Sequence, residues 1–322
     1  MYLAQQWRLL GLAALVIAVD LVWAAGGHFQ IDMIAYARLA ALAILLLGAG
    51  VFYQEKRNEP ALAAMLLGAS FLVIFSAGAS VLNYFLLTVA GSRIDTVLVK
   101  ADRMMGFDWY HVMVTMANHP MLNALLFRIY NMVLPEVALV LVVLAWSGRI
   151  GGAYRYCIAL AVGALIAIGV WTLMPSLGAK SLYVLPPEVT KKLTLSVTCD
   201  YGAALVALLH NGPGYITPAD MRGLIAFPSY HGVLAVIMAF YAWQISWLRW
   251  PALLFNAVVI VSSPIQGGHH MVDLLGSFPV AALAIFIASR SESASLVNKL
   301  SPVSGHSGHM AAIPCHHDTS QR

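Results

Sequence analysis

Long runs of apolar residues limit what this chain can fold into more than any other feature. A helix needs about 20 such residues to cross a bilayer, and the sequence offers eight candidate stretches, at residues 9–25, 34–52, 61–90, 122–146, 154–173, 230–247, 250–262 and 270–289. Only 10% of the residues are charged and 61% are hydrophobic, whereas about 25% are charged in soluble proteins. The sequence therefore predicts an all-α polytopic membrane protein with about eight transmembrane helices, and it excludes disordered, fibrous and disulfide-scaffold classes.

We expect the chain to be divided into three segments. Residues 1–60 hold two N-terminal transmembrane helices, residues 61–290 hold a six-helix membrane core, and residues 291–322 form a tail. The tail is polar and rich in histidine, with almost no apolar residues to bury, so we expect it to be disordered. Zinc binding by the tail is the alternative, but its histidines and Cys315 have no regular ligand spacing.

Basic residues indicate how the bundle lies in the membrane. With a cytoplasmic N-terminus, the short cytoplasmic loops and ends contain most of the basic residues near the spans, namely Arg8, Lys56, Arg57, Arg149, Arg155, Arg249, Arg290 and Lys299. The other side receives two long loops, at about residues 91–121 and 175–228, whose charges count less. The positive-inside rule therefore predicts that both termini are cytoplasmic, and we expect no nucleic-acid partner despite the net charge of +4.

Two polar motifs stand out from the apolar background. One runs from Phe227 to His231, and the other runs from Ser262 to Asp273 and contains His269. The residues between the two histidines suffice for two membrane crossings and a tight turn. A helical hairpin would therefore return both histidines to the same face of the membrane, which is the outer face in the predicted orientation.

The residue types in these motifs suit phosphoryl transfer. His269 and Asp273 are four apart, so on a helix they share a face, and the carboxylate can fix the tautomer of His269 and leave its other nitrogen as a nucleophile. His231 can hand a proton to a departing alkoxide. Ionisable groups at membrane depth are functional candidates by default, and we therefore predict that these three residues are catalytic.

An anion-binding environment is expected around the three residues. Each motif opens a helix, whose unpaired N–H groups attract anions, and Gly268 lets the backbone come close to a ligand. Lys180 and Arg222, in the outer loop, can neutralise phosphate oxygens. Ser229 completes the candidate phosphate-binding set. For His270, substrate contact and a structural hydrogen bond are both open.

The two motifs resemble known signatures. Pro228-Ser229-Tyr230-His231, and Ser262 followed by His269 and Asp273, are similar to the second and third signatures of the type 2 phosphatidic acid phosphatase superfamily. The resemblance covers about residues 120–290 and looks strongest to the inositolphosphotransferase branch, which includes inositol phosphorylceramide synthases. It implies that His269 becomes phosphorylated, that Asp273 orients it, and that His231 acts as acid and then as base. It implies no metal and no other cofactor.

The chain departs from the superfamily pattern at two places. Ser263 stands where an Arg commonly follows the serine of the third signature, and Lys180 is followed seven residues later by Pro187 rather than by Arg-Pro. We expect Arg222 to supply a missing cation.

The predicted function is that of a membrane phosphotransferase which acts on a lipid-linked phosphate or phosphodiester through a phosphohistidine. The acceptor is a lipid or sugar hydroxyl; with water as acceptor the enzyme is a lipid phosphate phosphatase. An anion-binding transporter and a zinc hydrolase are the alternatives from other classes. The expected location is a bacterial inner membrane with the site facing the periplasm.

Overall fold

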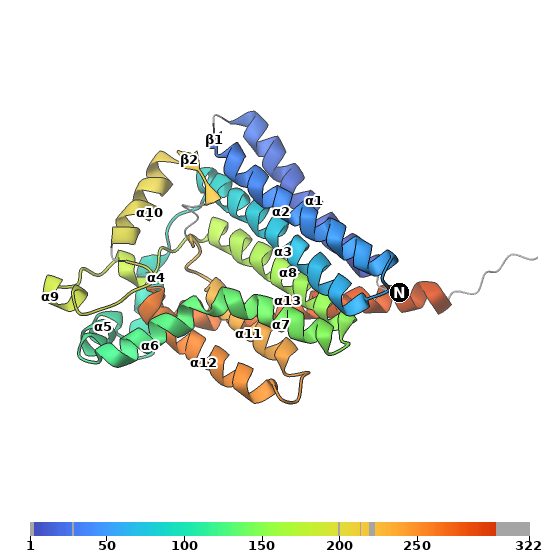
Figure 1. Ribbon diagram of the computed structural model, residues 1–322. Coiled ribbons are helices and arrows are strands. Elements are labelled where there is room, and N and C mark those ends of the chain that lie inside the picture. The colour runs from blue at the N-terminus through green and yellow to red at the C-terminus, as the bar shows by residue number, and fades with distance from the viewer. Residues whose placement is uncertain (1–2, 28, 199, 213, 219–222, 301–322) are drawn as a thin grey trace, which may run out of the picture.

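The computed structural model describes residues 3–27, 29–198, 200–212, 214–218 and 223–300. They form the predicted all-α fold, in which long helices lie side by side and shorter ones gather at one end (Figure 1). In chain order the elements are α1 (Leu3–Gly26), β1 (Gln30–Ile31), α2 (Met33–Glu55), α3 (Pro60–Phe85), η1 (Leu86–Val89), α4 (Asp95–Met104), α5 (Trp109–Ala117), α6 (Pro120–Asn131), α7 (Val133–Trp146), α8 (Ile150–Leu173), η2 (Ala179–Ser181), α9 (Pro187–Thr190), α10 (Asp200–Asn211), β2 (Tyr215–Ile216), α11 (Tyr230–Ala242), α12 (Arg249–Gln266) and α13 (Met271–Leu300).

Helix α8 is the central element of the bundle and packs against α3, α11 and α13. Its sequence is rich in small residues, which let neighbouring backbones approach closely within a membrane. A Cβ atom at Gly163, for example, would lie 3.0 Å from Cγ1 of Val233 on α11. The close packing of α11 and α13 on α8 brings the two predicted motifs to one end of the molecule.

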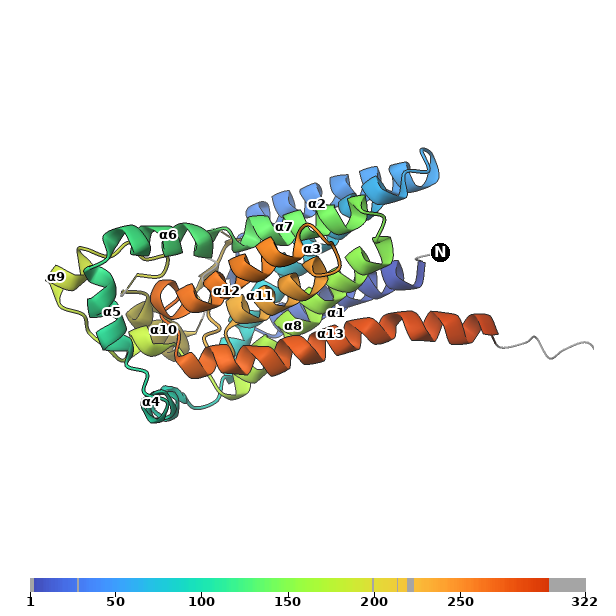
Figure 2. The ribbon, with the colours of Figure 1, turned by 90° about the horizontal axis from the view of Figure 1, so that it is seen from below.

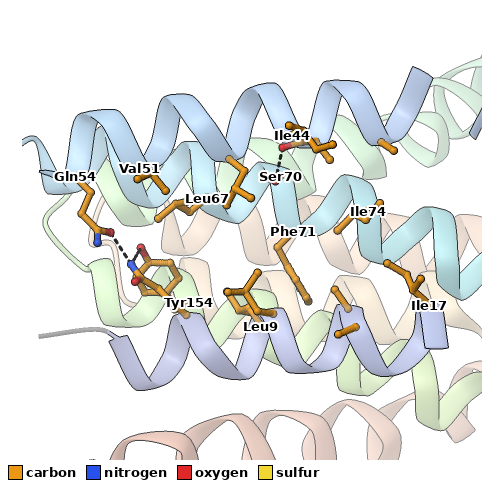
Figure 3. A pocket seen from close by; sticks show the side chains of 17 residues that line it. Leu9, Ile17, Ile44, Val51, Gln54, Leu67, Ser70, Phe71, Ile74 and Tyr154 are labelled. Carbon is orange, nitrogen blue, oxygen red and sulfur yellow. Dashed lines mark hydrogen bonds between the residues drawn. The ribbon is translucent and has the colours of Figure 1, made fainter. Parts of the chain in front are cut away.

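The N-terminal helices α1 and α2 both pack against α3. Leu9 and Val16 of α1 join the main hydrophobic core. A groove of about 390 Å³ with mostly apolar walls lies among the three helices (Figure 3). Gln6 lies at one end of it and donates to Oε1 of Gln54 at 2.7 Å and to the hydroxyl of Tyr154 at 2.9 Å. Polar as well as apolar contacts therefore anchor these helices to the core.

Fewer helices than predicted are suited to crossing a membrane on their own. Within the described residues, five are long and apolar enough, and the bent pair α6 and α7, which meet at 48°, makes a sixth if it counts as one span. Two of the eight predicted spans fall outside this set: α11 has only 13 residues, about 20 Å of helix. Helix α12 has 18 residues but contains Arg249, Asn256 and Gln266.

A short parallel strand pair interrupts the all-α pattern. Strand β1, between α1 and α2, pairs with β2, which follows α10. Asp32 strengthens the junction: its N–H donates to the carbonyl of Ile216 at 2.9 Å, and its carboxylate accepts from Thr217 at 3.2 Å. The strand pair ties the N-terminal helices to the loop region beside the two motifs.

The described ends of the chain lie away from the motif-bearing end of the bundle. The start of α1 and the end of α13 lie at the opposite end from α4, α5, α9 and α10 (Figures 1 and 2). Helix α13 continues to Leu300, beyond the boundary predicted at residue 290. The rest of the predicted tail, residues 301–322, lies outside the described residues.

Candidate active site

The two predicted motifs meet where α11 begins and where α12 passes into α13. The N–H of Ser229 donates to the carbonyl of Asp273 at 3.0 Å. Ser229 also caps α11, because its hydroxyl accepts from the N–H of Gly232 at 3.4 Å. A Cβ atom at Gly232 would lie 2.4 Å from Oγ of Ser277 on α13. The two helix starts are therefore in direct contact.

His269 has its ring held from both sides. Its Nδ1 lies 3.2 Å from Oδ2 of Asp273 and 3.2 Å from the carbonyl oxygen of Ala226. Both partners are acceptors, so Nδ1 carries the hydrogen and Nε2 keeps its lone pair. Nε2 lies 3.3 Å from the hydroxyl of Ser229. Burial, and then the charge of Lys180, lower the pKa of His269 to about 3, so the imidazole is neutral near pH 7.

The spacing suggested that His269 and Asp273 lie on one helix, a turn apart. In the structure they are in contact, but His269 is not part of the helix. His269 precedes α13, which begins at Met271. Asp273 lies in the first turn and accepts from the N–H of His270 at 2.8 Å through the same Oδ2 that faces His269. A carboxylate that satisfies a free helix N–H thereby also orients the imidazole.

His231, in the first turn of α11, packs against Tyr130 of α6. The two rings are stacked with centroids 4.2 Å apart, and the Tyr130 hydroxyl lies 3.2 Å from Nδ1 of His231. A Cβ atom at Gly267 would lie 2.6 Å from Cδ2 of His269 and 2.7 Å from the Tyr130 hydroxyl. Tyr130 therefore links the surroundings of the two histidines, and its contacts fix the orientation of the His231 ring.

Lys180 lies against the loop that precedes His269. Its Nζ donates to the carbonyl of Gly267 at 2.9 Å and lies 4.3 Å from the ring centroid of Tyr201. Gly268 has φ +67, and a Cβ atom there would lie 2.5 Å from Cδ of Lys180, so a side chain at Gly268 would displace the lysine. The arrangement holds a cation beside His269, where an anionic substrate would need one.

His270 is completely buried, and its ring contacts α4. Its Nδ1 lies 2.8 Å from Oδ2 of Asp102 on α4, and the other oxygen of Asp102 accepts from the N–H of Val272 at 3.1 Å. Nε2 of His270 lies 4.0 Å from Oδ1 of Asp95, and Asp95 in turn accepts from the N–H of Leu177 at 2.8 Å. Of the two readings of His270, this geometry fits the structural hydrogen bond rather than substrate contact.

The neutral imidazole of His269 and the cation of Lys180 both lie beside Gly267, and Tyr130 connects this position to the imidazole of His231. A sequence profile described as the PAP2 superfamily matches residues 96–287 of the chain. The chain belongs to this superfamily. Its membership supports a phosphatase-type enzyme that acts on lipid phosphate, and so favours an enzyme over the anion transporter. No curated protein and no solved structure matches the chain.

Two departures from the superfamily pattern have different outcomes in this PAP2 chain. Ser263 is buried, and its hydroxyl donates within α12 to the carbonyl of Val259 at 2.9 Å. It does not stand in for an arginine. The second departure is that Pro187, not Arg-Pro, follows seven residues after Lys180, and Arg222, which was expected to supply the missing cation, lies outside the described residues.

Several residues of this candidate site were not singled out from the sequence. Tyr130 lies in a predicted span, Asp95 and Asp102 lie in the first long outer loop, and Gln266 ends α12. Gln266 is buried, accepts from the N–H of Ser196 at 3.1 Å, and thereby fixes the loop before α10. Asp95 and Asp102 are seven apart, a spacing that puts both on one face of a helix, and this was the one available signal.

Proposed function

We propose that this PAP2 chain transfers the phosphoryl-bearing part of a lipid-linked phosphate or phosphodiester to an acceptor through a phosphohistidine on His269. The observation that carries the proposal is the pair of acceptors, Asp273 and the carbonyl of Ala226, on Nδ1 of His269. With the hydrogen held there, Nε2 is available as the nucleophile without a change of tautomer.

Two chemical steps follow from this geometry. First, Nε2 of His269 attacks phosphorus, the bond from phosphorus to the leaving oxygen breaks, and His231 protonates that oxygen. Second, an acceptor hydroxyl attacks the phosphohistidine, its proton passes to His231, and His269 is released. Lys180, Ser229 and the backbone at Gly268 are the proposed phosphate-binding groups.

The acceptor is proposed to be a lipid or sugar hydroxyl, as in the inositolphosphotransferase branch. Ser229 and Asp273 are inaccessible to solvent, and His269 is only 5% exposed. A site that excludes water limits hydrolysis of a reactive phosphohistidine. Burial therefore supports transfer over hydrolysis.

The experiment is an assay of the purified protein in lipid nanodiscs with phosphatidylinositol or phosphatidic acid as donor, with and without ceramide or diacylglycerol as acceptor. With ceramide as acceptor, we expect a new phosphodiester to accumulate from phosphatidylinositol and a new phosphomonoester from phosphatidic acid, and neither product without an acceptor. Release of free phosphate from phosphatidic acid, or of inositol phosphate from phosphatidylinositol, at the same rate without any acceptor would assign hydrolysis instead.

Variants test the assignment of residues in the same assay. His269→Ala should abolish turnover while the protein remains folded in detergent, and retention of most of the activity would refute the nucleophile. His111→Ala is the matched control, because His111 is exposed and lies on α5. It should retain wild-type activity.

We also propose that the site faces the periplasm of a bacterial inner membrane. The start of α1, the α2–α3 and α7–α8 connections and the start of α12 lie away from the end that holds α5 and α9 (Figure 2). These segments contain Arg8, Lys56, Arg149 and Arg249. An excess of basic residues in short loops is typical of the cytoplasmic side.

A further inference from the structure

A second cavity lies in the membrane-spanning part of the bundle, away from His269. It has a volume of about 410 Å³ and lies between α7 and the first half of α12. Its walls are mostly apolar and include Leu139, Leu248 and Phe255, and Glu136 is the acidic residue among the lining side chains. A carboxyl group in an otherwise apolar pocket at membrane depth needs an explanation.

The polar groups at this cavity are incompletely bonded. Nδ2 of Asn256 donates to Oε1 of Glu136 at 2.7 Å and to the carbonyl of Ala252 at 2.9 Å. Oε2 of Glu136 and Oδ1 of Asn256 are enclosed, and neither has a hydrogen-bond partner among the described residues. The two side chains therefore do not form a closed acid–amide pair. Each side chain is left with one oxygen unpaired within the part of the chain that the structure describes, and leaving a buried acceptor unpaired is costly.

The depth of Glu136 restricts what can supply the donor. Glu136 lies ten residues before Trp146, which ends α7, and Asn256 lies ten residues before Gln266, which ends α12. At the helical rise, each distance is about 15 Å, half of the hydrocarbon thickness. A phosphate or ammonium headgroup is costly at that depth, whereas the single hydroxyl of a neutral lipid can reach it.

We propose that this cavity binds a neutral lipid alcohol of the diacylglycerol type, whose chains lie against the apolar walls. Its free hydroxyl donates a hydrogen bond to the Glu136 carboxyl when that side chain turns its unpaired oxygen toward the cavity. The bend of 48° between α6 and α7 lies directly before this part of α7, beside Met132, which also lines the cavity. Binding of the alcohol in this cavity does not require the proposed phosphoryl transfer, and it can be measured without a phosphate donor.

The test uses photocross-linking in phosphatidylcholine nanodiscs that contain the full-length protein. The probe is a diacylglycerol with a photoactivatable diazirine in one acyl chain, and unlabelled dioleoylglycerol and its 3-O-methyl ether compete with it. We expect cross-links on α7 and α12, and competition by the alcohol about tenfold stronger than by the ether, as for loss of a hydrogen bond to a charged or strongly polar acceptor. Equal competition by alcohol and ether in the wild-type protein overturns the proposal.

Two variants make the test specific. Glu136→Gln keeps Oε1 as acceptor for Asn256 but can present an N–H₂ donor to the cavity, so it should remove the preference for the alcohol. Leu139→Trp fills the cavity from a residue that is 51% exposed, and it should reduce cross-linking of the probe severalfold. A preference that persists in Glu136→Gln, or cross-linking that is unchanged in Leu139→Trp, contradicts the site. Turnover of phosphate donors is assayed separately, so a failure here leaves the proposed function standing.

Discussion

At the scale of single residues, the proton on His269 is placed by its neighbours. An imidazole whose Nδ1 faces Asp273 and the carbonyl of Ala226 has one tautomer that satisfies both acceptors. Because burial and Lys180 keep the ring neutral, its Nε2 lone pair is available at physiological pH. Asp273 and the carbonyl of Ala226 would stabilise positive charge on the ring once Nε2 bonds to phosphorus.

Tyr130 gives a prediction about His231. Tyr130→Phe keeps the stacked ring but removes the hydroxyl that lies 3.2 Å from Nδ1 of His231. Loss of one hydrogen bond that positions a catalytic group should lower kcat by about tenfold and leave KM nearly unchanged. Steady-state kinetics measure both constants. An unchanged kcat would mean that the hydroxyl does not position the ring.

Asp102 gives a prediction about stability and pH. Burial lowers the pKa of His270, but the hydrogen bond to Asp102 and the charges of Asp273 and Asp95 outweigh it and raise the pKa above its ordinary value. A raised histidine pKa stabilises the fold fully below the ordinary value of about 6.5, and this contribution is lost as the pH rises through the folded-state pKa.

Asp102→Asn removes the charge and nearly preserves the shape. We expect it to lower the melting temperature by several degrees at about pH 5.5, since a hydrogen bond to a charged group contributes about 1.5–3 kcal/mol, and by less at about pH 8.5. Thermal unfolding in detergent at both values measures this. A loss that grows with pH would contradict the charged pair of His270 and Asp102.

At the scale of elements, the pairing of β1 with β2 connects α1 and α2 to the segment after α10, a helix that contacts Lys180 of the candidate site. Asp32 caps α2 by accepting from the N–H of Ala35 at 2.9 Å and bonds the segment after α10. Tyr201 of α10, in turn, contacts Lys180. Asp32→Ala should raise KM severalfold with little change in kcat, and lower stability by about 1 kcal/mol through loss of the cap.

Asp32→Asn is the matched variant, because an asparagine side chain also caps a helix. It should restore most of the stability and most of the substrate affinity. Kinetics and thermal melting of the two variants separate the outcomes: a KM unchanged in Asp32→Ala would show that the strand pair does not influence the site.

Elements also show where sequence reasoning succeeds and where it stops. The apolar stretches locate α1, α2, α3, α8 and α13. Each of these helices must present apolar side chains to lipid or to neighbouring helices along its membrane-crossing length. The strand pair has no sequence signal, since two residues in each strand are too few for an alternating pattern. Helix α11 was expected to extend to Trp247, but it ends at Ala242, because helix ends depend on tertiary contacts.

The candidate site also contains some contacts that the sequence predicts and others that it does not. The contact of His269 with Asp273 was expected from their spacing of four residues, although it forms where the chain enters α13 and not within one helical turn. The contacts of Tyr130 with His231 and of Asp102 with His270 join residues 101 and 168 positions apart. Such pairs depend on the path of the whole chain, which periodicity does not reveal.

At the scale of the whole molecule, the site and the described chain ends lie at opposite ends of the bundle. The proposed orientation predicts the accessibility of single cysteines in a chain whose three native cysteines are replaced by alanine. Glu188→Cys, on the site side, should react with a membrane-impermeant maleimide in intact cells. Asn58→Cys, between α2 and α3, should react only after permeabilisation. The reverse pattern would place the site in the cytoplasm.

Trapping the intermediate tests directly whether His269 carries the phosphoryl-bearing group. In His231→Asn, slower protonation of the leaving oxygen should slow formation of the adduct on His269, and slower activation of the acceptor should slow its removal. Protein incubated with labelled donor and no acceptor can be quenched in alkali, digested and sequenced by mass spectrometry. We expect a phosphorus-bearing adduct on His269 that forms in the wild-type protein and disappears when acceptor is added. An adduct on another residue, or turnover with no adduct on His269 in either protein, would contradict it.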